Sequence, residues 1–331
     1  SSQSHSTIVS IRREDFMKKW IYTAVLLLFA GALAGCANQQ KTQEGEQRYA
    51  YPLATASPED TVTQIYAEKF VEEVDRLSEG RIKIQVYPNS VLGGDRELLE
   101  SCYDGDIPFI IQNTAPQVTF IPDTAIFDAP CIFKDLEEVR KTVDDPEFFA
   151  QIQESYRDSG YELLGYSDQG FRVMSTNKEV TSFEDFSGQK IRTMENSYHL
   201  EFWSALGANP TPMNFSEVYI GLQQNTIDAQ ENPYEVIVSN NLYEQDFYDE
   251  LPEEDQEILI EAQEIAREYS REASDERISQ RIETIEESGT QIITLDDETR
   301  QAMIDASAAI YEDIRESVDP GIYEAYMGDR D

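Results

Sequence analysis

The sequence predicts an α/β fold of about two domains. Helix-like and strand-like segments alternate along the chain, which is typical of a sheet covered by helices. The 331 residues correspond to about two domains at the usual ~150 residues each. Hydrophobic residues make up 40% of the chain and aromatic residues 11%, so the chain is too apolar to be disordered throughout.

The alternation begins with a predicted helix at residues 57–77. Ser57 supplies a capping hydroxyl, Pro58 stands in the first turn, and two acids follow near the positive end of the helix. Apolar residues then recur at helical spacing, and Gly80 is placed to end the helix. The next predicted elements are a strand at 82–86, a helix at 98–102 and a buried strand at 107–111.

The alternation of predicted strands and helices continues towards the C-terminus. The predicted strands are 161–166, 171–175, 191–194 and 291–294, and the predicted helices are 198–206, 251–289 and 298–318, with a short turn or helix at 184–186. We expect the acids of the long helix 251–289 to form a solvated face rather than a partner-binding surface.

Charge and rare residue types exclude several classes of function. The chain has 65 acidic and 26 basic residues and a net charge of −39, which argues against a nucleic-acid partner. Its two histidines and three cysteines form no CxxC pair, no HExxH motif and no pair of histidines for a metal site or a catalytic triad. We therefore expect neither a cofactor nor a metal.

Residues 17–35 have the features of a lipoprotein signal peptide. Two lysines follow Met17, an apolar stretch runs from 21 to 34, and the string LAGC ends at Cys36. As a helix this stretch would cover about 21 Å, less than the ~30 Å hydrocarbon core, so a permanent membrane span is the weaker interpretation. LAGC resembles the bacterial lipobox, in which the cysteine is lipidated. The alternative is that Cys36 is an ordinary core thiol.

The segments on either side of the signal are not expected to belong to the folded part. Residues 1–16 lack apolar periodicity and precede the signal start, so we interpret them as a mis-started or non-native extension. Residues 36–47 are rich in Gln, Lys and Glu and predict a short polar tether.

Five strings, in order along the chain, resemble the solute-binding proteins of tripartite ATP-independent periplasmic (TRAP) transporters, the DctP family. They are YPNSVLGGDRELLE at 87–100, GFR at 170–172, FEDFSGQKIRTMEN at 183–196, LGANPTPMNFSEVYIGLQQNTIDAQENP at 206–233 and LPEEDQEIL at 251–259. The resemblance implies a two-lobe periplasmic-binding-protein-like fold that closes over one small ligand. It divides the chain into lobe 1 (48–169), lobe 2 (170–250), and a long helix with C-terminal helices that pack on both lobes (251–331).

Two arginines stand in strand-like stretches among apolar residues. A buried arginine must be paired, and a carboxylate is the geometric match for its fork. From the residues alone, the partner of Arg172 or Arg192 is either one of the many acids of the protein or a ligand. The resemblance implies that Arg192 pairs with the ligand carboxylate, that Arg172 is a second cleft arginine, and that Asn232 helps to fix the same group.

Other cleft candidates are weaker. Asp95 lies near a polar position in the first lobe of the family, and Asn113 ends an apolar strand, although each is also typical of a turn cap or a surface group. Trp203 and Tyr219 are either apolar walls of the cleft or, as we favour, core residues. Pro116 stands near the place where members that bind sialic acid carry a further arginine, which argues for a smaller organic acid.

Three further features leave questions open. Cys102 and Cys131 are either a disulfide or free buried thiols, and we favour free thiols. His199 is interpreted as a helix-surface residue. After Gln245 the chain lacks a two-strand segment by which the family crosses back to the first lobe, which puts the hinge and the first sheet in question.

The resemblance implies an extracytoplasmic receptor, anchored to the membrane by a lipid on Cys36. It would capture a small organic carboxylate, either a C4-dicarboxylate or a sugar acid, and deliver it to the membrane permease subunits of a TRAP transporter. The alternatives are a sensory ligand-binding protein and, less favoured, a carboxylate-based hydrolase.

Overall fold

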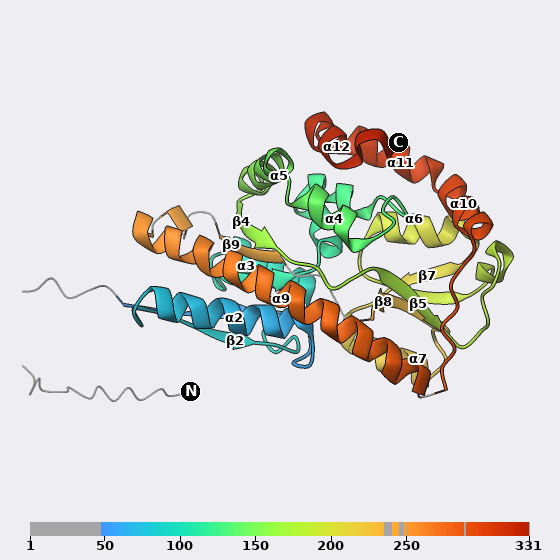
Figure 1. The fold of residues 1–331 in the computed structure, drawn as a ribbon, viewed down its shortest axis with the longest axis horizontal. Helices are drawn as coiled ribbons and strands as arrows, with labels where there is room; N and C mark the ends of the chain where they lie inside the picture. Colours follow the sequence, from blue (N-terminus) through green and yellow to red (C-terminus); the bar gives the residue numbers. More distant parts are fainter. Residues whose placement is uncertain (1–47, 235–239, 245–247, 250, 288, 331) are drawn as a thin grey trace, which may run out of the picture. The chain divides into compact units, whose positions relative to one another are not determined.

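Two sheets form the two lobes of the protein (Figure 1). The computed structural model describes residues 48–234, 240–244, 248, 249, 251–287 and 289–330. The first sheet has five strands in the order β2-β1-β3-β9-β4, and the second has four in the order β5-β8-β6-β7. Helices accompany both sheets, so the predicted α/β fold is confirmed.

The first lobe combines a parallel part with an antiparallel part. Its strands are β1 (Tyr49–Ala54), β2 (Ile82–Tyr87), β3 (Phe109–Gln112), β4 (Tyr161–Tyr166) and β9 (Asn240–Glu244). β1 runs parallel to β2 and β3, whereas β9 runs antiparallel to β3 and β4. The accompanying helices are α2 (Val62–Leu77), α3 (Asp95–Tyr103), α4 (Leu136–Val143) and α5 (Pro146–Asp158), with 3₁₀ turns η1 (Ala115–Thr119) and η2 (Pro122–Asp128).

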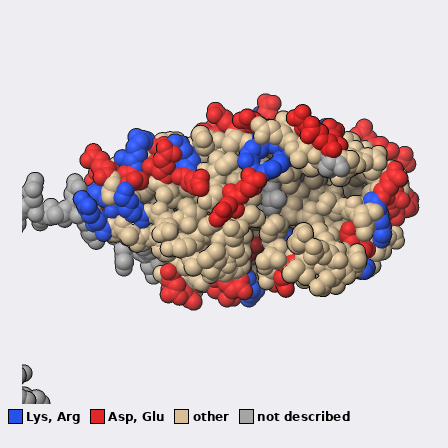
Figure 2. All heavy atoms as spheres, turned by 90° about the horizontal axis from the view of Figure 1, so that it is seen from below, with Lys and Arg blue, Asp and Glu red and all other residues tan. Residues whose placement is uncertain are grey.

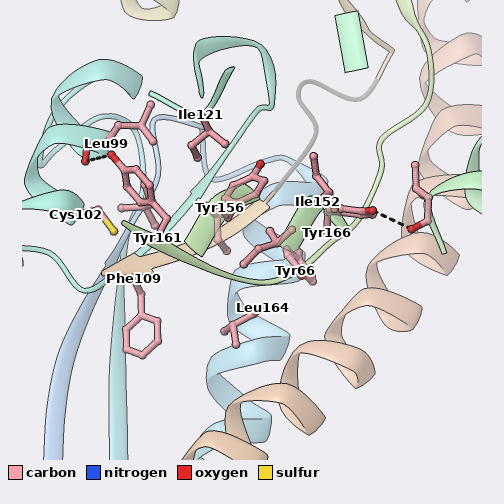
Figure 3. Close-up of a cluster of buried hydrophobic side chains, with 14 of the residues drawn as sticks. Tyr66, Leu99, Cys102, Phe109, Ile121, Ile152, Tyr156, Tyr161, Leu164 and Tyr166 are labelled. Carbon is pink, nitrogen blue, oxygen red and sulfur yellow. Dashed lines mark hydrogen bonds between the residues drawn. The ribbon is translucent and has the colours of Figure 1, made fainter. Parts of the chain in front are cut away.

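Buried tyrosines build much of the first-lobe core (Figure 3). The hydroxyls of two of them are satisfied by backbone carbonyls, because a buried hydroxyl without a partner is costly. Tyr161 donates to the Leu99 oxygen at 3.0 Å, and Tyr166 donates to the Val143 oxygen at 2.9 Å. These bonds tie β4 to the helices α3 and α4.

Strand β9 corrects the expectation that the return crossing is lost. The chain passes from β8 in the second sheet to β9, which lies between β3 and β4 and completes the first sheet. The return is made before Gln245, by a single strand that ends at Glu244. The first sheet therefore has its return strand, and the predicted effect of a missing segment on the hinge stays a prediction.

The second lobe is smaller. Its strands are β5 (Arg172–Thr176), β6 (Lys190–Thr193), β7 (Asn209–Pro212) and β8 (Ala229–Pro233). β6 pairs in parallel with both β7 and β8, and β5 runs antiparallel to β8. Helices α6 (Ser197–Ala205) and α7 (Phe215–Gln223) and the 3₁₀ turn η3 (Phe183–Phe186) complete the lobe, and its core is formed around Phe186, Ile191, Trp203 and Leu206.

The long helix α9 (Glu253–Glu287) links the lobes. Its first half packs on α2 and buries Leu259, Ala262 and Ala266 in the first-lobe core. Figure 1 shows it extending from α2 towards the second lobe. Near the crossing segment between β4 and β5, the Ser270 and Ser167 hydroxyls lie 2.7 Å apart. α9 therefore supports both the first lobe and the connection that leaves it.

The last helices are α10 (Asp297–Ala306), α11 (Ala308–Ser317) and α12 (Pro320–Met327), followed by the 3₁₀ turn η4 (Gly328–Arg330). α10 adds Met303 and Ala306 to the second-lobe core, and α11 and α12 bury Ile314 and Tyr326 in the first. No helix among the described residues combines the length and the hydropathy needed to cross a membrane. The expected extension 1–16, signal peptide 17–35 and tether 36–47 lie outside the described residues.

Three predicted elements need correction. Residues 291–294 form no strand, because alternation alone cannot supply the neighbouring strand that a ladder requires. The helix 298–318 is divided at Ser307, whose hydroxyl donates to the Met303 carbonyl at 2.7 Å and bends the chain. The first helix begins at Val62 rather than at 57, since Thr61 and not Ser57 is the cap that accepts from the Gln64 amide at 3.3 Å.

The contact between β4 and α9 predicts the effect of a small substitution. A Cβ at Gly165 would overlap the side-chain amide of Gln263, which is buried and donates to the Tyr66 hydroxyl at 3.0 Å. We expect Gly165→Ala to destabilise the protein by about 1–3 kcal/mol in urea unfolding. Gln263→Ala in the same chain should make room, so the double variant should lose less than the sum of the two single losses. Additive losses would contradict this packing.

Candidate functional site

A cavity of about 400 Å³ lies between the two lobes. The first lobe lines it with Asp95, Arg96, Pro116 and Phe120, among others, and the second lobe with residues that include Arg192, Glu195, Asn196 and Met213. Several of the second-lobe residues come from the carboxyl ends of β6 and β7 and from the turns that follow. Ligands of α/β sheets bind at such strand ends, so this cavity is the candidate binding site.

Arg192 is the buried cation of the cavity. It stands on β6, between β7 and β8, and is only 2% exposed. Its Nε donates to the Met213 carbonyl at 2.8 Å, and its guanidinium carbon lies 5.9 Å from the centre of the Phe215 ring. None of the carboxylates that the structure describes forms an ion pair with it. Burial, and secondarily the neighbouring Arg172, lower the pKa of Arg192 to about 10.

Arg172 has an internal partner. It forms a forked ion pair with Glu231, in which its Nη2 lies 2.9 Å from Oε1 and its Nε contacts Oε2. The same Nη2 donates to the Asn232 side-chain oxygen at 3.2 Å, and the Asn232 amide donates to Gln230 at 2.6 Å. Neither Arg172 nor Asn232 lines the cavity. The structure thus brings them together around Glu231, beside rather than in the cavity wall, and their ligand roles stay predictions.

Asp95 lies in the cavity wall at the first position of α3. Burial raises the pKa of its carboxyl to about 6, with Arg192 acting in the opposite direction and Glu97 and Glu195 adding to the rise. The Gln112 amide donates to its backbone oxygen at 2.6 Å. An acid with a raised pKa thus lies within the electrostatic reach of the buried guanidinium.

Asn113 lies at the lobe interface rather than in the cavity wall. It is buried, and its amide donates to the Met194 sulfur of the second lobe at 3.5 Å. Its side-chain oxygen has no hydrogen-bond partner in the described part of the chain. It thus joins the lobes through a weak contact.

The sequence analysis missed several residues of the cavity. Glu195 and Asn196 lie within three residues of the end of β6, so the rule that ligands bind at strand ends could have indicated them. Arg96 is exposed, pairs with Glu100 at 3.3 Å and lies over the Phe120 ring at 5.6 Å. No spacing signal would have distinguished Arg96 from an ordinary surface arginine.

Other predictions are settled by burial. Trp203 is a core residue as favoured, but Tyr219 is 70% exposed and belongs to neither the core nor the cavity wall. The interpretation of His199 as a surface residue is wrong, because its side chain is only 15% exposed and its Nε2 lies 2.9 Å from Asp128. Cys102 and Cys131 are both free.

The surface charge explains how an anion could still approach. On the face in Figure 2 the acidic side chains gather mainly at the edges, and much of the middle is uncharged. At physiological salt, the repulsion between these surface acids and an approaching anion is largely screened beyond about 8 Å. A buried guanidinium such as that of Arg192 acts at contact, so a net charge of −39 does not exclude an anionic ligand.

Comparisons with known proteins agree on one family. The model of DctP, bacterial extracellular solute-binding protein family 7, matches residues 53–246 and 242–317. The two matched stretches overlap at residues 242–246, at the end of β9. A solute-binding protein from Verminephrobacter eiseniae is 31% identical over 254 residues, which cover 70% of this chain and 76% of that protein.

Two further relatives have named ligands. The ectoine/5-hydroxyectoine-binding periplasmic protein UehA of Ruegeria pomeroyi is 30% identical, over 84% of this chain and 86% of that protein. The crystal structure of a TRAP periplasmic solute-binding protein from Polaromonas sp. JS666, bound to D-erythronate, matches with a TM-score of 0.79 at 27% identity. That match covers 85% of this chain and 99% of the other.

The raised pKa of Asp95 predicts how stability changes with pH. An aspartate ordinarily has a pKa of about 3.9, so the folded protein holds this proton more tightly than the unfolded chain. The stabilisation is therefore fully present below about pH 4 and is lost as the pH rises through about 6. We expect Asp95→Asn to gain melting temperature relative to the wild type on going from about pH 5 to about pH 8.

The matched control for this measurement is Asp104→Asn, which changes an exposed acid at the other end of α3. Its melting temperature relative to the wild type should not follow the pattern of Asp95→Asn. If the difference between Asp95→Asn and the wild type is the same at both pH values, the proposed titration is wrong.

Proposed function

The chain belongs to bacterial extracellular solute-binding protein family 7, the DctP family, and from that premise we propose that Arg192 clamps the carboxylate of a small organic acid in the cleft. Proteins of this family bind solutes outside the cytoplasm for TRAP transporters and are a transport class rather than enzymes. We infer that this chain passes its ligand to TRAP permease subunits in the membrane.

The observation that carries the proposal is the unpaired state of Arg192 within the described residues. Leaving a buried charge without a partner costs several kcal/mol. One hydrogen bond, from Nε to Met213, leaves the other guanidinium N–H groups available at the cavity. A carboxylate is their geometric match, because it accepts two parallel N–H bonds. A bound organic acid would therefore complete an interaction that the protein leaves open.

The charges of the cavity favour a sugar acid over a C4-dicarboxylate. Besides Arg192, the cavity wall holds Arg96, which already pairs with Glu100, and the acids Asp95 and Glu195. A second ligand carboxylate would face these acids, whereas ligand hydroxyls can donate to them. The D-erythronate in the Polaromonas protein is a ligand of the favoured kind. Pro116 in the wall supplies no cation for a larger anionic sugar.

The first test is a thermal-shift screen of the chain from Asn38 onwards. The ligands are D-erythronate, other sugar acids, C4-dicarboxylates, ectoine and neutral sugars. A ligand at 100 times its dissociation constant adds about 2.7 kcal/mol, which is several degrees in a chain of this size. We expect sugar acids to raise the melting temperature at lower concentrations than dicarboxylates. The hydroxyls of a sugar acid can donate hydrogen bonds to the acids of the cavity wall, whereas a second carboxylate would be repelled by them.

The variants Arg192→Ala and Arg76→Ala separate recognition from general charge. Arg192→Ala should abolish the shift, and Arg76→Ala should leave it unchanged, because Arg76 is an exposed residue of α2 that pairs with Glu73. A shift with neutral sugars alone, or an unchanged shift in Arg192→Ala, would refute the carboxylate clamp. A shift with ectoine alone would keep the receptor function and change the ligand class.

We also propose that Cys36 carries a lipid that holds the protein at the outer face of the cell membrane. Two or more acyl chains give stable anchoring, at about 0.8 kcal/mol for each buried CH₂ group. When residues 17–331 are expressed in a bacterial host, we expect the protein in the membrane fraction with a lipid-modified N-terminus at residue 36. Cys36→Ser should lose the lipid, and Cys131→Ser should keep it. A mature protein without lipid mass would contradict the anchor.

A further inference from the structure

We propose that Asp128 of the first lobe, with Asn196 and His199 of the second, forms a latch that holds the lobes closed around the ligand. This latch rests on the proposed function, because it acts on closure of the same cleft. Asp128 ends η2 next to the first-lobe core, and Asn196 and His199 lie at the start of α6. The three residues therefore meet across the boundary between the lobes.

The hydrogen bonds of the latch are short and buried. The Asn196 amide donates to the Asp128 Oδ2 at 2.7 Å and to the Ala115 carbonyl at 2.9 Å. The His199 Nε2 lies 2.9 Å from the Asp128 Oδ1. Both side-chain partners of the Asp128 carboxylate in the described chain thus belong to the second lobe.

Burial makes these bonds a condition for closure. The Asp128 side chain is 2% exposed, and a buried carboxylate without partners is strongly unfavourable. When the lobes separate, water can replace the lost partners. When they close, the carboxylate is satisfied only if Asn196 and His199 are in place. The closed state is therefore favoured in one alignment of the lobes and disfavoured in others.

The latch is joined to the ligand site through Asn196. This residue lines the cavity, caps α6 by accepting from the His199 amide at 3.0 Å, and donates to the first lobe with its other side-chain atom. The other ring nitrogen of His199 lies 3.9 Å from Glu231, the acid that holds Arg172. A displacement of the cavity wall would therefore displace the latch.

Asp123 provides a matched comparison on the same 3₁₀ turn. Its carboxylate accepts from the Ser155 hydroxyl at 2.7 Å and from the Asp319 amide at 2.8 Å. Ser155 lies on α5 of the first lobe, and Asp319 caps α12, which packs on that lobe. Asp123 thus stabilises the first lobe itself, whereas Asp128 acts between lobes.

The experiment compares Asp128→Asn, His199→Phe and Asp123→Asn with the wild type. The probe is D-erythronate, or the organic acid with the largest shift in the screen above. Calorimetry gives the dissociation constant, the melting temperature without ligand gives the stability, and small-angle scattering gives the compaction on binding. The double variant Asp128→Asn with His199→Phe measures whether the two side chains act as one unit.

We expect Asp128→Asn and His199→Phe each to weaken binding about 10-fold, because each removes a hydrogen bond to a charged group. Their ligand-free melting temperatures should stay near that of the wild type, since the open form does not make the latch. The double variant should lose little more affinity than either single variant. Asp123→Asn should lower the melting temperature and leave the affinity unchanged.

Unchanged affinity and compaction in both Asp128→Asn and His199→Phe would overturn the latch. A fall in melting temperature that accounts for the whole loss of affinity would also overturn it, because Asp128 would then be an ordinary stabilising residue. If the wild type binds no organic acid, the proposed function fails and the latch fails with it.

Discussion

The guanidinium of Arg192 is the interaction on which the arrangement of the cleft depends. It is buried on β6, it is fixed by one backbone carbonyl, and no described carboxylate pairs with it. Arg172 is close enough to lower its pKa. Two neighbouring cations would repel each other, but Glu231 neutralises Arg172 through a forked pair. The protein thus satisfies one arginine internally and leaves the other for a ligand.

This division of roles is informative because acids are abundant. The chain has 65 acidic residues against 26 basic ones, so an internal partner for Arg192 would be easy to supply. Asp95 lies nearby, and burial raises its pKa to about 6, but it forms no ion pair with Arg192 among the described contacts. Its protonated form could donate a hydrogen bond and its ionised form could accept one. The cleft therefore combines a fixed cation with a group suited to hydroxyls.

Local patterns predicted much of the fold. The alternation at 82–86 identified β2, and the apolar neighbours of Arg192 identified β6, because both signals lie within a few residues. β7 was missed, since its sequence NPTP has two prolines and it is held by pairing with β6 at the edge of the sheet. β9 was misinterpreted because its place between β3 and β4 is set by pairing with distant strands.

The site residues, too, could be predicted only where the signal lies in the neighbouring sequence. Arg192 and Asp95 could be predicted from their neighbours and from the resemblance, and both lie in the cavity wall. His199 could not, because its partner Asp128 lies 71 residues away in the chain and on the other lobe. Arg172 was predicted to meet a ligand, but only the pairing of β5 with β8 brings Glu231 within reach of it.

Recognition and closure are linked by the order of residues after β6. Arg192 lies in the buried part of this strand, Glu195 and Asn196 follow its end, and α6 begins at Ser197. The residue that caps α6 also reaches the first lobe, at Asp128 and at the Ala115 carbonyl. Only five residues, 192–196, separate the guanidinium that a ligand would neutralise from the contacts that join the lobes, so a ligand that binds Arg192 and contacts this turn acts close to both.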